Sequence, residues 1–262
     1  MRMARTLKIA TWNINSVRLR VSHLKSIDAD IVCLQEMKCQ DHQVPLAEIE
    51  EMGFKHNYFR GEKAYNGVGI FSKLPLTNVE ILDFGGRVQA RHISAKLPNG
   101  TRLHNFYVPA GGDEPDVATN PSYAHKLQFL DDMEAYFVGL KSSHIAVGDF
   151  NVAPFEHDVW SSKQLRNVIS HTPPERERMM KMYATLGWVD SARHFVPMNE
   201  KCYSWWSYRN KDWEKSNRGR RLDHIWVTPD LRDKLVGHEV MRHARNWEKP
   251  SDHVPVVVEI GF

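Results

Sequence analysis

The feature that most constrains the fold is a series of short apolar runs, each bounded by polar or turn-forming residues. Their β-branched content and turn-rich boundaries predict β-strands. The runs cover residues 7–14, 29–36, 67–72, 91–97, 101–108, 143–150, 221–228 and 254–260. The sequence Pro98-Asn99-Gly100 between two of them predicts a hairpin, because Asn-Gly supplies the positive φ angles of a tight turn. At least part of the sheet is therefore expected to be antiparallel.

Helical patterns fall between these runs. Apolar residues recur at helical spacing over residues 17–27, 122–140 and 174–186. No low-complexity linker or clear repeat divides the chain. A single α/β domain over residues 1–262 is the simplest expectation.

The composition is that of an ordinary globular protein, with 42% hydrophobic and 26% charged residues. The net charge of +3 permits a polyanionic partner without requiring one. The densest basic stretch, residues 209–221, carries Trp213 and follows Trp205, Trp206 and Tyr208. A solvated loop is the simplest explanation of this charge. The interleaving of cations with aromatic rings nevertheless favours a nucleic acid partner.

The cysteines argue for a reducing compartment. Cys33, Cys39 and Cys202 form no CxxC pair and are odd in number, which disfavours a disulfide framework or a cysteine zinc site. The first residues break into polar ones before any apolar core of signal length, and no stretch approaches a membrane span. We expect a cytoplasmic protein that does not act at a membrane.

Polar residues gather at the ends of the apolar runs, where α/β folds usually place their sites. These residues are Asn13, Asn15, Gln35, Glu36, Tyr107, Asp149, Asn151, Asp223, Asp252 and His253. Each by itself is explained equally well as a cap or a turn residue. Together they suit a hard cation such as Mg²⁺, which prefers oxygen ligands, better than zinc, which prefers His and Cys. Phosphodiester hydrolysis is the chemistry that such a set serves.

Six blocks of sequence carry a family resemblance. They are TWNINSVR (11–18), DIVCLQEMK (30–38), NFYVPAGG (105–112), VGDFNVAP (147–154), RRLDHIWV (220–227) and SDHVPVVVEI (251–260). In this order the blocks closely resemble the exonuclease III family of abasic-site (AP) DNA endonucleases, within the DNase I-like superfamily of endonucleases, exonucleases and phosphatases. The resemblance implies a four-layered α/β sandwich of two packed mixed β-sheets flanked by helices.

The resemblance also implies roles for individual residues. Catalytic residues would be Tyr107, Asp149, Asn151, Asp223 and His253. Metal-binding residues would be Asn13, Glu36, Asp149, Asn151, Asp252 and His253. The metal would be Mg²⁺, with Mn²⁺ able to substitute. An acid beside His253 raises its pKa and fixes its tautomer, but whether His253 or Asp149 is the general base stays open.

DNA contacts are implied in the same way. They would involve Asn15, Arg91, Trp205, Arg209, Lys211, Arg220 and Leu222. Trp205 and Leu222 fall where the family lines an apolar pocket for a base-free sugar, whereas we assign Trp206 to the core. Two departures from the family pattern stand out: Ala110 lies where relatives often have an amide, and Arg220 replaces an aromatic residue found in some members.

The implied function is a Mg²⁺-dependent hydrolase of base excision repair. It would cut the phosphodiester 5′ to an abasic site, and would also have 3′–5′ exonuclease and 3′-phosphodiesterase or phosphatase activity. The partner would be double-stranded DNA with abasic sites or blocked 3′ ends, and the protein a monomer. The alternatives are a phosphatase of the same fold acting on phosphoinositides or sphingolipids, and an inactive DNA-binding module.

Overall fold

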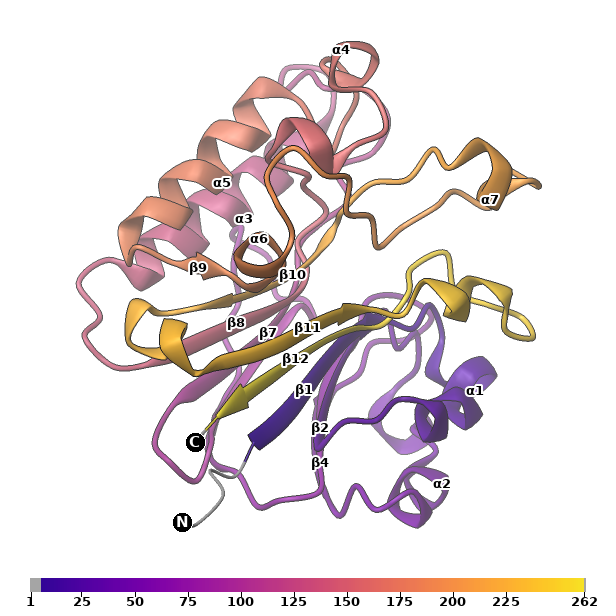
Figure 1. Ribbon diagram of the computed structural model, residues 1–262, viewed down its shortest axis with the longest axis vertical. Helices are drawn as coiled ribbons and strands as arrows, with labels where there is room; N and C mark the ends of the chain where they lie inside the picture. The colour runs from indigo at the N-terminus through magenta and orange to yellow at the C-terminus, as the bar shows by residue number, and fades with distance from the viewer. Residues whose placement is uncertain (1–5, 262) are drawn as a thin grey trace.

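Two six-stranded β-sheets pack face to face in the computed structural model, which describes residues 6–261 (Figure 1). The first sheet has the order β11-β12-β1-β2-β4-β3 and the second β5-β6-β7-β8-β10-β9. The strands are β1 Thr6–Asn13, β2 Ile31–Gln35, β3 His56–Arg60, β4 Val68–Ser72, β5 Thr77–Glu80, β6 His92–Lys96, β7 Arg102–Tyr107, β8 His144–Asp149, β9 Val189–Asp190, β10 Asp223–Val227, β11 Leu235–Val240 and β12 Val256–Gly261.

Each sheet has one parallel pair of strands at its centre. β1 pairs with β2 in the first sheet and β7 with β8 in the second, while every other described pairing is antiparallel. The carboxyl ends of these four strands lie toward the side from which the loop around α7 (Trp213–Ser216) projects (Figure 1). This shared edge gives the fold a place to gather polar side chains from both sheets.

The main core lies between the two sheets. Ile9, Ile31 and Val258 of the first sheet meet Val147 and Ile225 of the second in one apolar cluster. Because side chains alternate along a strand, the intervening residues of the central strands face outward into further clusters under the helices. The central strands are therefore apolar on both faces, which explains their nearly continuous apolar runs.

Helices cover both outer faces (Figure 1). The α-helices and 3₁₀ helices (η) are α1 Val17–Arg20, η1 Val21–Ser26, η2 Asp41–Gln43, α2 Leu46–Glu51, α3 Pro121–Phe137, η3 Glu156–Asp158, α4 Ser162–Leu165, α5 Pro173–Thr185, α6 Ser191–Phe195, α7, η4 Pro229–Lys234 and η5 Arg242–Asn246. α3 and α5 pack on the second sheet, and α1, η1 and α2 on the first. The predicted fold of two packed mixed sheets flanked by helices is confirmed.

Each of the eight predicted strands is present, but four others were missed. β5 is exposed along its whole length, and β9 has only two residues. β3 is half-buried, and a register shift between Leu235 and Gly237 interrupts β11. Short, exposed or irregular strands lack the apolar alternation by which strands are predicted.

The three predicted helices are also present, with changed ends. Residues 17–27 form α1 followed by the tighter η1 instead of one α-helix. The side chain of Asn120 caps α3 by accepting hydrogen bonds from the backbone of Ser122 and Tyr123, and the helix ends at Phe137. Thr172 and Glu175 form a capping box that starts α5.

The predicted hairpin joins β6 to β7, but with a different turn. The Leu97 and Thr101 backbones are paired across a loop of three residues, and Gly100 alone in that loop has a positive φ angle, of 89°. The turn is therefore not the two-residue type that Asn-Gly favours.

Further expectations concern the cysteines, membrane-spanning helices, the N-terminal stretch and the number of domains. Cys33, Cys39 and Cys202 are buried and unbonded. Within residues 6–261 no helix is both long and apolar enough to cross a bilayer. Residues 1–5, part of the N-terminal stretch in which no signal sequence is expected, and residue 262 lie outside the described part. The single domain stays a prediction, supported by an inter-sheet core that draws on residues from Ile9 to Ile260.

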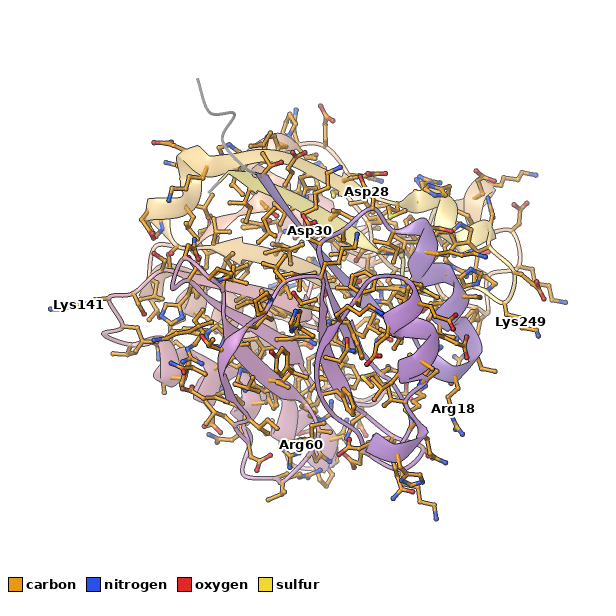
Figure 2. All side chains as sticks on the ribbon, turned by 90° about the horizontal axis from the view of Figure 1, so that it is seen from below. Arg18, Asp28, Asp30, Arg60, Lys141 and Lys249 are labelled. Carbon is orange, nitrogen blue, oxygen red and sulfur yellow. The ribbon has the colours of Figure 1, made fainter. Side chains whose placement is uncertain are left out.

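Charged side chains cover the outside of the fold. Arg18 and Lys249 project from the rim beside α1, and Lys141 projects from the opposite end of the molecule (Figure 2). Lys141 precedes β8 and therefore lies at the opposite end of that strand from Asp149.

Candidate active site

The polar cluster forms where strands of both sheets end or begin. Asn13 ends β1, Glu36 directly follows β2, Tyr107 ends β7 and Asp149 ends β8. Asp223 begins the antiparallel strand β10 directly opposite Asp149. His253 also belongs to this group, and its backbone carbonyl accepts a hydrogen bond from the indole of Trp12, 241 positions earlier in the chain.

Glu36 is the centre of the first half of the site. Its Oε1 atom accepts hydrogen bonds from the hydroxyl of Tyr107 at 2.5 Å and from the amide of Asn13 at 3.2 Å. Its Oε2 atom lies 2.7 Å from the ammonium nitrogen of Lys38. Burial opposes ionisation of Glu36, but the hydrogen bonds from Lys38 and Tyr107 outweigh it and lower the pKa of this carboxyl.

Asp149 is the centre of the second half. Its Oδ2 atom accepts hydrogen bonds from the amides of Asn13 at 2.9 Å and Asn151 at 3.0 Å, and its Oδ1 atom accepts one from the Asn151 backbone at 2.9 Å. Asn13 thus donates to both Glu36 and Asp149, and holds the two carboxylates side by side. Asn13 turns its own amide oxygen toward the backbone N–H of Asn15 at 3.1 Å.

His253 lies between two aspartates. Its Nδ1 atom is 2.8 Å from Oδ2 of Asp223, and its Nε2 atom is 3.7 Å from Oδ2 of Asp149. The hydroxyl of Ser204 donates to the same oxygen of Asp223 at 2.6 Å. His253 is 6% exposed and both aspartates are more deeply buried. Nδ1 is directed at Asp223, so Nε2 is the nitrogen that faces Asp149.

The charges of this trio depend on one another. Burial disfavours the imidazolium form of His253, but the carboxylates of Asp223 and Asp149 outweigh it and raise the pKa of His253. Burial raises the pKa of Asp149; the cation of His253 opposes this rise and the charge of Asp223 adds to it. The charge of His253 and that of the two aspartates therefore stabilise one another.

The backbone at the site is unusual. Asn15, Ser16, Glu36, Lys38 and Asn151 all have positive φ angles, between 47° and 87°, without being glycine. Such conformations are uncommon for residues with a side chain and are concentrated at functional sites. They turn consecutive side chains at the strand ends toward the same face.

Asp252 is tied to the periphery of the cluster. One carboxylate oxygen accepts a hydrogen bond from the indole of Trp205 at 3.0 Å and the other from the amide of Asn15 at 3.3 Å. The oxygen of the Asn15 amide in turn accepts one from Lys38 at 2.7 Å. Asn15 and Lys38 thus link Asp252 to Glu36.

The donor set fits a hard cation. Carboxylate oxygens of Glu36 and Asp149 share the amide of Asn13, and ligand atoms of Asp149, Asp223 and His253 all lie within 4.8 Å of one another. The Lys38 ammonium, which lies between oxygens of Glu36 and Asn15, is a second indication that this position favours a cation. One oxygen of Asp223 is buried without a hydrogen-bond partner among the described residues. No cysteine contributes, which agrees with the choice of an oxygen-preferring metal over zinc.

Three of the predicted DNA-binding residues line one groove beside the site. Trp205, Arg209 and Arg220 face it together with Trp160 and Arg218. Lys211 is exposed on the loop before α7. Leu222 is 4% exposed and packs beneath the groove with Trp160 and Trp205.

Arg91 lies in a different environment. It is 6% exposed, its guanidinium stacks on the ring of Tyr107 at 4.7 Å, and it donates a hydrogen bond to the Tyr107 carbonyl at 3.2 Å. This position supports Tyr107 from behind, and a direct contact of Arg91 with DNA phosphate stays a prediction. The assignment of Trp206 to the core is confirmed, and Trp213 is also packed there against Trp206.

Gln35 and Ala110 also take positions that their sequence context did not indicate. Gln35 is fully buried and donates hydrogen bonds to Thr11 and to Asn105 of the other sheet, so it joins the two sheets. The carbonyl of Ala110 accepts a hydrogen bond from Lys126 at 3.2 Å. Its methyl side chain supplies no polar group to the site.

Sequence reasoning overlooked several residues that hold the site in place. Lys38, two residues after Glu36 in the motif QEMK, could have been found from its charge beside a predicted metal-binding acid. Ser204 precedes the noted Trp205 but gives no signal of its own. Arg20 donates hydrogen bonds to the carbonyls of Lys249 at 2.7 Å and Pro250 at 3.1 Å, and so fixes the loop before Asp252.

Comparisons with known proteins agree with this geometry. Residues 10–253 match the endonuclease/exonuclease/phosphatase family. An exodeoxyribonuclease of Bacillus subtilis is 33% identical over 273 aligned positions, covering 98% of this chain and 100% of the relative. The solved AP endonuclease of Archaeoglobus fulgidus is 35% identical with a TM-score of 0.88, covering 96% of this chain and 98% of its own. The Neisseria 3′ phosphatase NExo, solved with a product DNA hairpin, is 29% identical with a TM-score of 0.89, covering 98% of this chain and 100% of its own. The chain therefore belongs to the endonuclease/exonuclease/phosphatase family, and is a nuclease of the exodeoxyribonuclease III and AP endonuclease group.

Proposed function

We propose that this protein is a Mg²⁺-dependent DNA repair nuclease that hydrolyses the phosphodiester on the 5′ side of an abasic site and leaves a 3′-hydroxyl. The same centre would remove nucleotides and phosphate-containing blocking groups from the 3′ ends of duplex DNA. All these reactions break the bond between phosphorus and a 3′ oxygen, so one site serves them all.

The observation that carries the proposal is the position of His253 between Asp223 and Asp149, beside Glu36. Asp223 lies 2.8 Å from Nδ1, and Nε2 faces Asp149 at 3.7 Å. An imidazole held in this way can donate a hydrogen bond or a proton to a phosphate oxygen. Asp149 can orient or deprotonate a water, because its raised pKa brings it closer to neutral pH.

Glu36 and Tyr107 would act on the other side of the phosphate. Glu36, with Asp149 or with Asp252 through Asn15, would hold Mg²⁺, for which Mn²⁺ could substitute. When bound, the ion neutralises phosphate charge and stabilises the leaving oxygen. Burial and the neighbouring charge of Glu36 raise the pKa of Tyr107 well above its usual value, so its hydroxyl stays protonated and can donate to the phosphate. Asn151 would hold the water beside Asp149, with its amide nitrogen also fixed on the Val108 carbonyl at 2.9 Å.

Double-stranded DNA would lie across the strand ends and the neighbouring groove. Arg209, Lys211 and Arg220 supply positive charge there, and Asn15, Trp205 and Leu222 shape the surface next to the site. Phosphate contacts of this kind position a duplex without reading its sequence. We further propose that the protein acts as a cytoplasmic monomer.

A labelled duplex with one synthetic abasic site tests the proposal. The protein should cut 5′ to that site in Mg²⁺ and not in excess EDTA. Asp149→Asn should reduce the rate constant of cleavage about a hundredfold or more while keeping DNA affinity, because it removes the base or the water-orienting charge. Phe195→Ala, an exposed change at the end of α6, serves as the control that should cut normally.

The result would also separate the alternatives. Turnover of an inositol phosphate or a sphingolipid without abasic-site cleavage would establish a phosphatase of the same fold. Tight binding of the abasic duplex without any cut in Mg²⁺ or Mn²⁺ would establish a binding module. A cut that persists in EDTA would show that no metal is required.

A further inference from the structure

Arg20, the last residue of α1, is buried where three loops meet, and is 7% exposed. One loop follows β1 and carries Asn15, a second precedes β12 and carries Asp252, and a third carries Tyr208. Among residues 6–261 no carboxylate lies within 4.0 Å of the Arg20 guanidinium. Arg20 is therefore not placed there to form an ion pair.

The hydrogen bonds of Arg20 use all the donors that its side chain has. A guanidinium carries five N–H groups, whereas the ammonium of lysine carries three. All the acceptors are oxygens of the three loops. They are the carbonyls of Ile14 at 3.2 Å, Asn15, Lys249 at 2.7 Å and Pro250 at 3.1 Å, and the hydroxyl of Tyr208 at 3.3 Å. Arg20 thus joins the three loops to one another, and no lysine could do the same.

Two of these acceptors belong to unusual backbone. Asn15 and Lys249 have positive φ angles, of 47° and 49°, although neither is glycine. Such conformations persist only where the surrounding contacts hold them. Because Arg20 donates to both carbonyls, it stabilises the turn that presents Asn15 and the turn that leads to Asp252.

The hydroxyl of Tyr208 is a second meeting point of the same loops. It accepts hydrogen bonds from Arg20 and from the amide of Asn15, each at 3.3 Å, and donates one to the carbonyl of Pro250 at 2.8 Å. The guanidinium of Arg245 stacks on the Tyr208 ring at 5.2 Å. Tyr208 is 47% exposed, yet its polar end is fully engaged within the protein.

Asn15 carries this arrangement into the candidate metal centre. Its amide nitrogen donates to Asp252 at 3.3 Å as well as to Tyr208, and its amide oxygen accepts from Lys38 at 2.7 Å. Lys38 in turn lies 2.7 Å from Oε2 of Glu36. The orientation of both predicted metal-binding acids, Glu36 and Asp252, is therefore linked to Asn15.

We propose that Arg20 is a positioning residue for the metal centre. Through the carbonyls of Asn15 and Lys249 and the hydroxyl of Tyr208, it holds Asn15 and Asp252 in the arrangement that binds the cation. Arg20 itself reaches neither the cation nor the phosphate. Groups that orient metal ligands commonly change metal affinity about 10- to 100-fold when they are removed. This inference rests on the proposed Mg²⁺-dependent function and deepens it.

Binding of Mn²⁺ to the DNA-free protein tests the inference directly. Electron paramagnetic resonance of the unbound Mn²⁺ gives the Kd without any turnover. Arg20→Lys keeps the charge but has too few donors for the three loops, so it should raise the Kd about tenfold. Tyr208→Phe keeps the ring beneath Arg245 and removes only the hydroxyl. It should raise the Kd about threefold or more.

Lys25→Met is the control, because Lys25 is an exposed cation on η1 that follows Arg20 in the chain. Its Kd for Mn²⁺ should stay within about twofold of the wild-type value. Combining Arg20→Lys with Tyr208→Phe should raise the Kd little beyond Arg20→Lys alone, since both changes remove the same hydrogen bond.

Cleavage of an abasic duplex at increasing Mg²⁺ concentrations provides the second measurement. Arg20→Lys should need about tenfold more Mg²⁺ for half-maximal kcat, and saturating Mg²⁺ should restore kcat to within about threefold of wild type. A residue that serves only the fold would lower kcat by the same factor at every Mg²⁺ concentration.

The outcomes separate this inference from the proposed function. Wild-type Mn²⁺ affinity in both Arg20→Lys and Tyr208→Phe, or an equal loss of affinity in Lys25→Met, would overturn the role of Arg20. A loss of kcat in Arg20→Lys that saturating Mg²⁺ does not restore would overturn it too. A wild-type protein that neither binds Mn²⁺ nor cuts the duplex would instead overturn the proposed function, and the inference with it.

Discussion

Asp223 fixes the orientation of His253 through a hydrogen bond of 2.8 Å between its Oδ2 atom and Nδ1. Both side chains are buried, and Asp223 is itself held by the hydroxyl of Ser204 and faces the strand that ends in Asp149. The imidazole is therefore held in one orientation, with Nδ1 toward Asp223 and Nε2 toward Asp149. The pairing of Asp223 with His253 therefore influences the charge of the imidazole.

We expect Asp223→Asn to lower kcat about a hundredfold or more, because an amide can donate to Nδ1 and so stabilise the wrong tautomer. DNA affinity should change little, since Asp223 is buried and does not reach the groove. Steady-state cleavage of an abasic duplex and a filter-binding measurement check the two parts. Ser204→Ala, which leaves the carboxylate in place, should have a much smaller effect on kcat; equal losses would show that Asp223 serves only the fold.

A second prediction concerns Lys126, which is completely buried and forms an ion pair with Glu175. Its ammonium also donates to the carbonyls of Asn151 at 2.8 Å and Ala110 at 3.2 Å, so it holds the left-handed backbone of Asn151. Lys126→Met should lower the free energy of unfolding by about 3–5 kcal/mol, because it leaves the buried charge of Glu175 unpaired. Urea denaturation measures this loss.

Two further variants test the reason for that loss. Lys126→Met combined with Glu175→Gln should recover much of the stability, since no buried charge remains. Lys181→Met breaks the ion pair with Glu134, in which the Lys181 side chain is 67% exposed, and should change stability by less than about 1 kcal/mol. A double variant no more stable than Lys126→Met would indicate that packing, and not charge, explains the effect.

A third prediction concerns pH and a chain of three histidines in the second sheet. The backbone N–H of Leu82 donates to Nδ1 of His92, so His92 must donate through Nε2 to His104 at 3.2 Å. His104 donates in turn to His144 at 3.0 Å, and His144 to Ser142 at 2.8 Å. The chain is satisfied only when all three rings are neutral.

Burial and the charge of Arg102 lower the pKa of His92 to about 3 and that of His144 to about 4, and burial also lowers the pKa of His104. The unfolded chain takes up protons near pH 6.5 and the folded chain does not, so stability is complete above that pH and falls as the pH is lowered. The loss should reach about 2 kcal/mol per buried histidine at pH 5.

Urea denaturation between pH 8 and pH 5 measures this loss. His144→Gln keeps an acceptor for His104 but does not titrate, so it should make the decline with pH less steep. His42→Gln, an exposed change, should leave the decline as it is. The same steepness in all three proteins would exclude the histidine chain as a cause; other buried histidines whose pKa is lowered are His125, His171, His224 and His238.

A fourth prediction concerns Gly148, next to Asp149 in β8. Its φ angle is 139°, and a Cβ atom there would collide with the backbone carbonyl of Phe106 in β7. Gly148→Ala should therefore destabilise the protein by at least about 3 kcal/mol and disturb Asp149. Gly100 also has a positive φ angle, but no atom lies within 4 Å of an added Cβ there. Gly100→Ala should therefore lower the free energy of unfolding by only about 1–2 kcal/mol. Thermal melting of the two variants measures the difference.

Much of the fold follows from local sequence. The central strands were predictable because they are buried on both faces and read as apolar runs. The strands β3, β5, β9 and β11 were not, because they are the edge strands of the two sheets and are short, exposed or irregular, so they lack a buried apolar run. The turn at Gly100 likewise follows from the register of β6 and β7 and not from the Asn-Gly pair alone.

The sequence by itself determined the chemistry available to this protein: acids, amides, a tyrosine and a histidine at the ends of apolar runs, and cations among aromatics after residue 204. Only the tertiary structure decided which of these meet. It placed Arg91 behind Tyr107, packed Trp213 in the core, and set Asp149 and Asp223 on either side of His253. The reason is physical: residue type is a local property, whereas distance, burial and charge neutralisation arise when two sheets pack and bring remote strand ends together.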